Sequence, residues 1–226
     1  MLSNLILRRV VLLGTPLVVA VDVVFLHPVL NGDVRTELFP VAGLWLTLHV
    51  VQLVLFGLMG VAAYLLLDGL SGIFAVIGRL AIAVFVVFYN AGDAVAGIST
   101  GILARGAVDL PAGEQVAVAQ AIAKLFADPT KQLIFTIGTY AWSVGLLAAA
   151  VALYRAGAPR LPLVPLALAA VPYIDFSGFD HSPPFDPLAL ALFFLAALWL
   201  ELARRKQRPP DEVETSSDRA PVPESH

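Results

Sequence analysis

The 226-residue sequence contains no cysteine, and this absence excludes several kinds of site at once. Disulfide bonds, thiolate catalysis and cysteine-ligated zinc or iron–sulfur centres all require cysteine sulfur. Any metal would have to be held by histidine nitrogen and carboxylate oxygen. The chain has only four histidines, so the choice of ligands is small.

Charged residues are also scarce, at 14 % of the chain, whereas a soluble domain has about 25 %. Hydrophobic residues make up 59 %, and the mean hydropathy is +0.85. This composition predicts an integral membrane protein whose main partner is the lipid bilayer. We expect no nucleic-acid partner.

The sequence lacks the short motifs that name a reaction. It contains no GxSxG nucleophile elbow, no Walker-type or Rossmann glycine loop, and no HExxH zinc motif. We therefore expect no nucleotide or iron–sulfur cofactor, and the function has to be argued from the placement of single residues.

Apolar runs long enough to cross a bilayer recur along the chain, since a membrane helix needs about 20 such residues. They predict an all-α, polytopic bundle of about six transmembrane helices. The predicted spans are residues 9–27, 43–67, 80–104, 132–154, 161–176 and 185–203. Residues 161–176 are short and contain three prolines, so their backbone carbonyls need partners from neighbouring helices.

The distribution of lysine and arginine predicts the orientation, because cytoplasmic loops are enriched in these residues. With both termini inside, ten of the 14 basic residues are cytoplasmic. The four on the outer side are Arg35, Arg105, Lys124 and Lys131. We therefore expect an N-in/C-in protein of the plasma (inner) membrane.

Two segments are not predicted to span. Residues 111–127 have apolar side chains on one face and polar ones on the other, and predict an extracytoplasmic amphipathic helix. Residues 207–226 are rich in proline, serine and acidic residues, and predict a disordered cytoplasmic tail. The transmembrane domain is therefore expected to be residues 1–206.

Polar residues of the predicted spans gather in the outer halves, and such groups usually face a bundle interior. They are Asp22 and His27 in the first span, His49 and Gln52 in the second, Tyr89, Asn90 and Asp93 in the third, and Tyr140 in the fourth. His181 falls in the last outer loop. Trp45, His49 and Gln52 share one helix face by their i, i+4, i+7 spacing. The pattern predicts a polar pocket open to the outer side.

One interpretation of this pocket is a metal site. His27, His49 and His181, with a nearby aspartate, could hold a divalent metal that activates water. The spacing carries no diagnostic motif, since each histidine comes from a different segment.

A second interpretation needs no metal. A carboxylic acid in a low-dielectric interior can stay protonated and act as a general acid. Asp93, His49, Tyr89 and Asp22 are then the candidate catalytic residues, and Asn90, Gln52, Tyr140 and Trp45 the candidate substrate-binding residues. The expected activity is that of a membrane-embedded enzyme acting on a lipophilic small molecule.

Two other classes remain open from sequence. A small proton- or cation-coupled carrier could use the same aspartates and histidine, although a carrier needs polar groups that continue to the inner face. Alternatively, the polar residues could only hold helices together in a structural or sensory protein.

Overall fold

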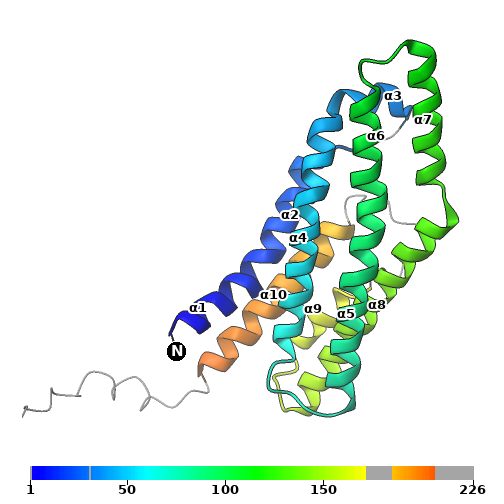
Figure 1. The fold of residues 1–226 in the computed structure, drawn as a ribbon. Coiled ribbons are helices and arrows are strands. Elements are labelled where there is room, and N and C mark those ends of the chain that lie inside the picture. The colour runs from blue at the N-terminus through cyan, green and yellow to red at the C-terminus, as the bar shows by residue number, and fades with distance from the viewer. Residues whose placement is uncertain (1, 31, 172–184, 207–226) are drawn as a thin grey trace, which may run out of the picture.

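A computed structural model describes residues 2–30, 32–171 and 185–206, and their regular structure is entirely helical (Figure 1). The helices are α1 (Leu2–Arg9), η1 (Val10–Gly14), α2 (Thr15–Val21), η2 (Asp22–Leu26), α3 (Val34–Glu37), η3 (Phe39–Val41), α4 (Ala42–Leu66), α5 (Ile73–Asp93), η4 (Ala94–Ser99), α6 (Thr100–Ala107), α7 (Ala112–Phe126), α8 (Pro129–Arg155), α9 (Leu163–Leu168) and α10 (Phe185–Lys206). The all-α prediction is therefore confirmed for the described residues.

Several of these elements join into longer continuous helices. Within the described residues, five are long and apolar enough to cross a membrane: Leu5–Leu26, Val34–Leu66, Ile73–Ala107, Pro129–Arg155 and Pro187–Arg204. They contain or closely match five of the predicted spans. The chain is thus a multi-pass membrane protein by the length and composition of its helices.

The predicted span 161–176 is not among these five helices. The helix found in its described part, 161–171, is α9, six residues long, and residues 172–176 lie outside the described part of the chain. Pro162 precedes α9 and Pro165 occupies its first turn, where a missing N–H is tolerated.

The third long helix begins seven residues before the predicted span, at Ile73. Arg79, which lies just outside the predicted span, is inside α5 and donates hydrogen bonds to the carbonyls of Leu67 and Leu70, at 2.7 and 2.8 Å. The turn between α4 and α5 places Gly69 and Gly72 at positive φ (73° and 94°), which glycine adopts without strain.

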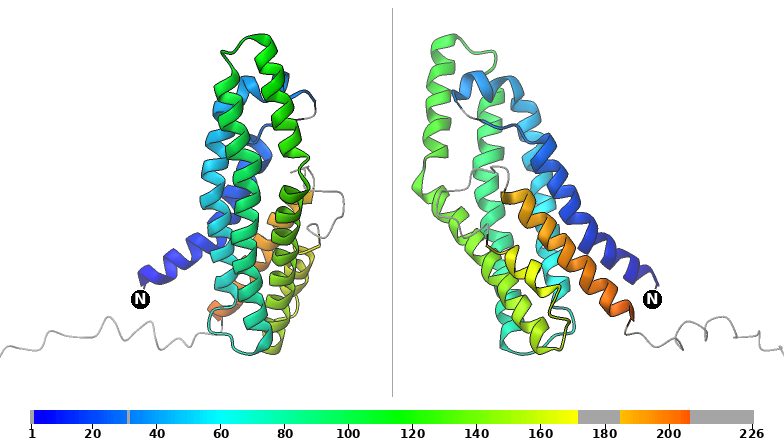
Figure 2. Two further views of the ribbon diagram at one scale, coloured as in Figure 1. Left: turned by 45° about the vertical axis from the view of Figure 1, so that its right-hand side comes forward. Right: turned by 180° about the vertical axis from the view of Figure 1, so that it is seen from behind.

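Helices α5 and α8 form the most extensive contact in the bundle. Small residues permit it: Gly138 lies against the backbone of Tyr89, and Gly145 against Ile82. The α1–α2 segment runs beside α10 on another side of the bundle (Figure 2).

The predicted helix 111–127 is present as α7. It runs alongside α6 rather than across the bundle, and its buried Ala119 and Ile122 join a second hydrophobic core beyond the main one. The other buried members of that core are Leu38, Phe39, Ala42, Trp45, Ala104 and Ala107. This core braces the end of the bundle that carries α3, α6 and α7. The predicted tail, 207–226, lies outside the described residues.

Candidate functional site

Four polar side chains from the first three long helices are buried together in the bundle. Asp22, His49, Gln52 and Asp93 are 4 %, 2 %, 0 % and 1 % exposed. Asp22 opens η2, His49 and Gln52 lie one turn apart on α4, and Asp93 ends α5. Burial of polar groups at this density is costly unless they interact, so these residues define the candidate site.

The hydrogen bonds of His49 assign the tautomer of its neutral ring. Its Nδ1 lies 2.8 Å from the backbone carbonyl oxygen of Trp45, which can only accept, so Nδ1 carries a hydrogen. In the neutral ring Nε2 is then the basic nitrogen. This Nε2 faces His27 Nε2 at 3.4 Å and Asp93 Oδ1 at 3.9 Å.

Trp45 fixes the position of His49 from both its backbone and its ring. Its indole N–H donates to the Gly97 carbonyl at 3.0 Å and to the Thr100 hydroxyl at 3.1 Å. Its ring lies 4.4 Å from the His49 ring and 5.0 Å from that of His27, centroid to centroid. Trp45, predicted to bind substrate, is thus 6 % exposed and holds the two imidazoles in place.

A second polar pair lies one helical turn deeper than His49. Gln52 Nε2 donates to Asp22 Oδ2 at 2.6 Å. The amide oxygen of the same side chain, Gln52 Oε1, is buried and accepts no hydrogen bond from the described residues.

Two of the three π-helical segments in the described residues adjoin this site, and the third, η1, lies earlier in the first long helix. The π-helical segment η2 starts at Asp22, and η4 follows Asp93 directly. Such π turns are rare in proteins and are frequent at functional sites, because they change the direction in which side chains leave the helix.

Three of the predicted site residues have different surroundings. Tyr89 is 4 % exposed, with its ring packed among Phe56, Phe85 and Phe135. Asn90 follows it on α5 and is half-buried. Tyr140 is 39 % exposed on α8 and has no hydrogen bond to the described part of the site.

The predicted metal ligands are brought together only in part. His27 and His49 meet, whereas His181 lies outside the described residues. Among residues that the structure describes, no three histidine or carboxylate groups are arranged to hold a metal ion.

Two residues that hold Trp45 were not among the predicted site residues: Gly97 and Thr100 accept its indole N–H. Lys131, expected in an outer loop, is 9 % exposed at the start of α8, with its ammonium over the Phe126 and Phe135 rings. The i, i+3 spacing of Gly97 and Thr100 was visible in the sequence, but their partner Trp45 is about fifty residues away.

No known protein family, no curated protein and no solved structure matches this chain. The geometry of the buried site is therefore the basis for any functional assignment.

Proposed function

We propose that the chain crosses the plasma membrane six times, with both termini on the cytoplasmic side. Ion pairs between Arg8 and Glu201 support this, because they bring the start of the first long helix and the end of α10 to the same side of the bundle. The end of α8 lies on that side too (Figure 1). An additional crossing between α8 and α10 then makes six, and the basic residues at this side fit a cytoplasmic face.

We further propose that His49, His27 and Asp93 form a proton-transfer site in the outer half of this bundle. The observation that carries the proposal is the contact of 2.8 Å between His49 Nδ1 and the Trp45 carbonyl oxygen, from which the tautomer follows. With Nδ1–H donated to Trp45, the basic Nε2 faces both a second imidazole and a carboxylate. A proton taken up at Nε2 creates an imidazolium that Asp93 stabilises.

This chemistry fits a membrane-embedded enzyme that acts on a lipophilic small molecule by acid–base catalysis. Asp22, bound to Gln52 one turn deeper, adds a second carboxyl group to the same interior. A substrate that reaches the site from the bilayer would exchange a proton with His49 in a low-dielectric environment, where such transfers are sensitive to the placement of each charge.

A metal-assisted variant of this function is favoured by one distance. Two nitrogens that bind one tetrahedral zinc at about 2.0–2.1 Å lie about 3.3–3.4 Å apart, which is the separation of the two Nε2 atoms, 3.4 Å. The Nδ1–H bond of His49 to a carbonyl is also the usual second contact of a metal-bound histidine. The predicted third histidine ligand is His181.

The test compares lipid extracts of cells that produce the wild type, Asp93→Asn or His49→Ala. We expect the amount of a lipophilic compound to change in cells that produce the wild type, and to stay unchanged in cells that produce either variant. Asp109→Asn, an exposed aspartate between α6 and α7, is the matched control and should behave as the wild type. Identical extracts from folded wild type and both site variants would overturn the enzymatic proposal.

Two further measurements separate the alternatives. Elemental analysis of the purified protein should give about one equivalent of metal, lost in His27→Ala and His49→Ala, only if the metal-assisted variant is right. Substrate flux that depends on a pH gradient across reconstituted vesicles, with no chemical change in the lipid extract, would instead assign a carrier.

A further inference from the structure

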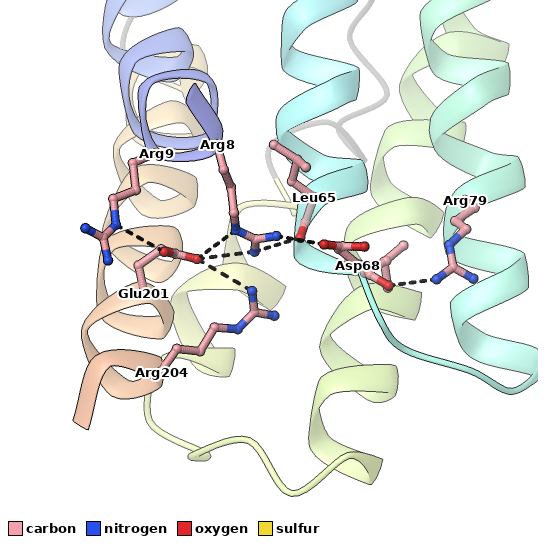
Figure 3. A network of polar contacts seen from close by, with 8 residues as sticks. Arg8, Arg9, Leu65, Asp68, Arg79, Glu201 and Arg204 are labelled. Atoms are coloured by element: carbon pink, nitrogen blue, oxygen red, sulfur yellow. Dashed lines mark hydrogen bonds and ion pairs between the residues drawn. The ribbon is translucent and has the colours of Figure 1, made fainter. Parts of the chain in front are cut away.

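The cytoplasmic side of the bundle contains a cluster of arginines around one carboxylate (Figure 3). Glu201 of α10 is 6 % exposed. Its Oε1 accepts from Arg8 Nε and Nη2 at 3.2 Å each and lies 3.5 Å from Arg204 Nη1, while its Oε2 lies 3.6 Å from Arg9 Nε. Three guanidinium groups therefore share a single carboxylate.

Arg8 is the structural member of this cluster. Besides Glu201 it pairs with Asp68 at 3.2 Å and donates to the Leu65 carbonyl at 3.0 Å. Its side chain is 15 % exposed. With partners on α4 and α10, Arg8 fastens the first helix to two others and has little capacity left for a ligand.

Arg9 and Arg204 differ from Arg8 in both exposure and bonding. Their side chains are 29 % and 37 % exposed, and each has one long contact to Glu201 and no other ion pair or hydrogen bond within the described residues. A guanidinium has five N–H donors, so most of the donors of these two residues are available to a further acceptor. Both flank the same carboxylate, one at each oxygen.

The cluster of charged side chains has a net positive charge. Arg8, Arg9 and Arg204 carry three positive charges against the two negative charges of Glu201 and Asp68. One additional negative charge would neutralise the cluster, and a phosphate monoanion supplies that charge together with oxygens that guanidinium N–H groups bind well.

The surface beside these arginines is apolar. Side chains at 42–63 % exposure precede and follow them on the first helix and on α10: Ile6, Leu7, Val10, Trp199 and Leu202. A free phosphate ion has no apolar part that could pack on such a surface, whereas the acyl chains of a phospholipid would cover it. Basic side chains followed by apolar ones are the arrangement of lipid-binding surfaces at the cytoplasmic leaflet.

We propose that Arg9 and Arg204 bind the phosphate of an anionic phospholipid, with its acyl chains lying along the first helix and α10. The bound lipid completes the charge of the Glu201 cluster and so stabilises the junction of the two helices. This site is at the opposite end of the first long helix from Asp22 and His27. Lipid binding there does not depend on whether the site around His49 is catalytic.

The experiment measures thermal unfolding of the full-length protein in detergent with added phosphatidylglycerol, phosphatidylcholine or inorganic phosphate. We expect phosphatidylglycerol to raise the midpoint by about 3 °C or more, and phosphatidylcholine and phosphate to have little effect. Arg9→Gln and Arg204→Gln should each reduce this rise. Arg160→Gln, an exposed arginine on the same side whose hydrogen bond is to Tyr154, should retain it.

The size of the lipid-induced rise, rather than the midpoint itself, is the result that counts, because either variant can also lower the intrinsic stability. Native mass spectrometry provides a second readout as the number of phosphatidylglycerol molecules retained by each variant. An equal rise with inorganic phosphate, or an equal rise in all variants, would overturn the assignment to a specific lipid site.

Discussion

The imidazole of His49 rests directly on the backbone of Gly97. A Cβ atom on residue 97 would lie 1.7 Å from His49 Cδ2 and 2.0 Å from Cγ, closer than any real contact. The carbonyl of the same glycine accepts the indole N–H of Trp45. Gly97 therefore makes room for the histidine and helps to hold the tryptophan that orients it.

Gly97→Ala should displace His49 and separate its Nε2 from His27 and Asp93. We expect a loss of stability of about 1–3 kcal/mol, as for other overpacked cores, and loss of the site's function even where the protein still folds. Thermal unfolding measures the loss of stability, and the comparison of lipid extracts from producing cells measures the loss of function. Gly57→Ala on α4 is the control, because a Cβ there meets nothing within 4 Å.

Gly138 has a different role, in the contact between α8 and α5. A Cβ on this residue would lie 2.7 Å from the backbone nitrogen of Tyr89, and backbone cannot move aside as a side chain can. Gly138→Ala should therefore force the two helices apart and cost about 1–3 kcal/mol. We expect a clear fall in the unfolding midpoint of this variant. The control is Gly106→Ala, whose Cβ would enter open space and whose midpoint should be unchanged. Equal midpoints for both variants would contradict the tight helix contact.

Local patterns were enough to predict the long helices, because apolar length is a property of consecutive residues. Local patterns also placed His49 and Gln52 on one helix face, as found. The start of α5 was missed because Arg79 resembles a loop residue. The carbonyls of Leu67 and Leu70, which accept its hydrogen bonds, become its partners only after the chain turns back.

Contacts between segments far apart in the chain could not be predicted from a single sequence. Arg8 and Glu201 are 193 residues apart, and the histidine pair joins the end of the first long helix to α4. Without related sequences, nothing marks such partners, since helix periodicity identifies a face but not what that face meets. Trp45 was predicted to contact substrate because it shares a helix face with His49. In the structure its indole N–H donates to Gly97 and Thr100.

The Gln52–Asp22 pair predicts a specific cost for removing the amide. Gln52→Leu keeps a similar volume but deprives the buried Asp22 carboxylate of a donor at 2.6 Å, and should destabilise the protein by about 1–3 kcal/mol. The control is Gln132→Leu, an exposed position on α8 where changes usually stay within about 0.5 kcal/mol. A Gln52→Leu protein as stable as this control would show that the pair contributes little.

The start of α8 contains a carboxylate whose contribution depends on pH. Asp128 caps this helix by accepting from the backbone N–H groups of Thr130 and Lys131, at 2.8 and 3.3 Å, and these hydrogen bonds lower the pKa of Asp128 below its ordinary value. Because the folded pKa lies below the unfolded one, the stabilisation is complete above the unfolded pKa. It is lost as the pH falls through the folded pKa.

Asp128→Ser isolates this effect, because serine also caps helices but does not titrate in this range. We expect the wild type to have the higher unfolding midpoint near neutral pH, where the charged carboxylate also interacts favourably with the positive end of the helix dipole. That advantage should shrink as the pH is lowered from about 7 to about 3. Unfolding midpoints of both proteins across this range provide the measurement. A difference that stays constant down to the lowest pH would show that the charge of Asp128, as opposed to its hydrogen bonds, contributes nothing to the cap.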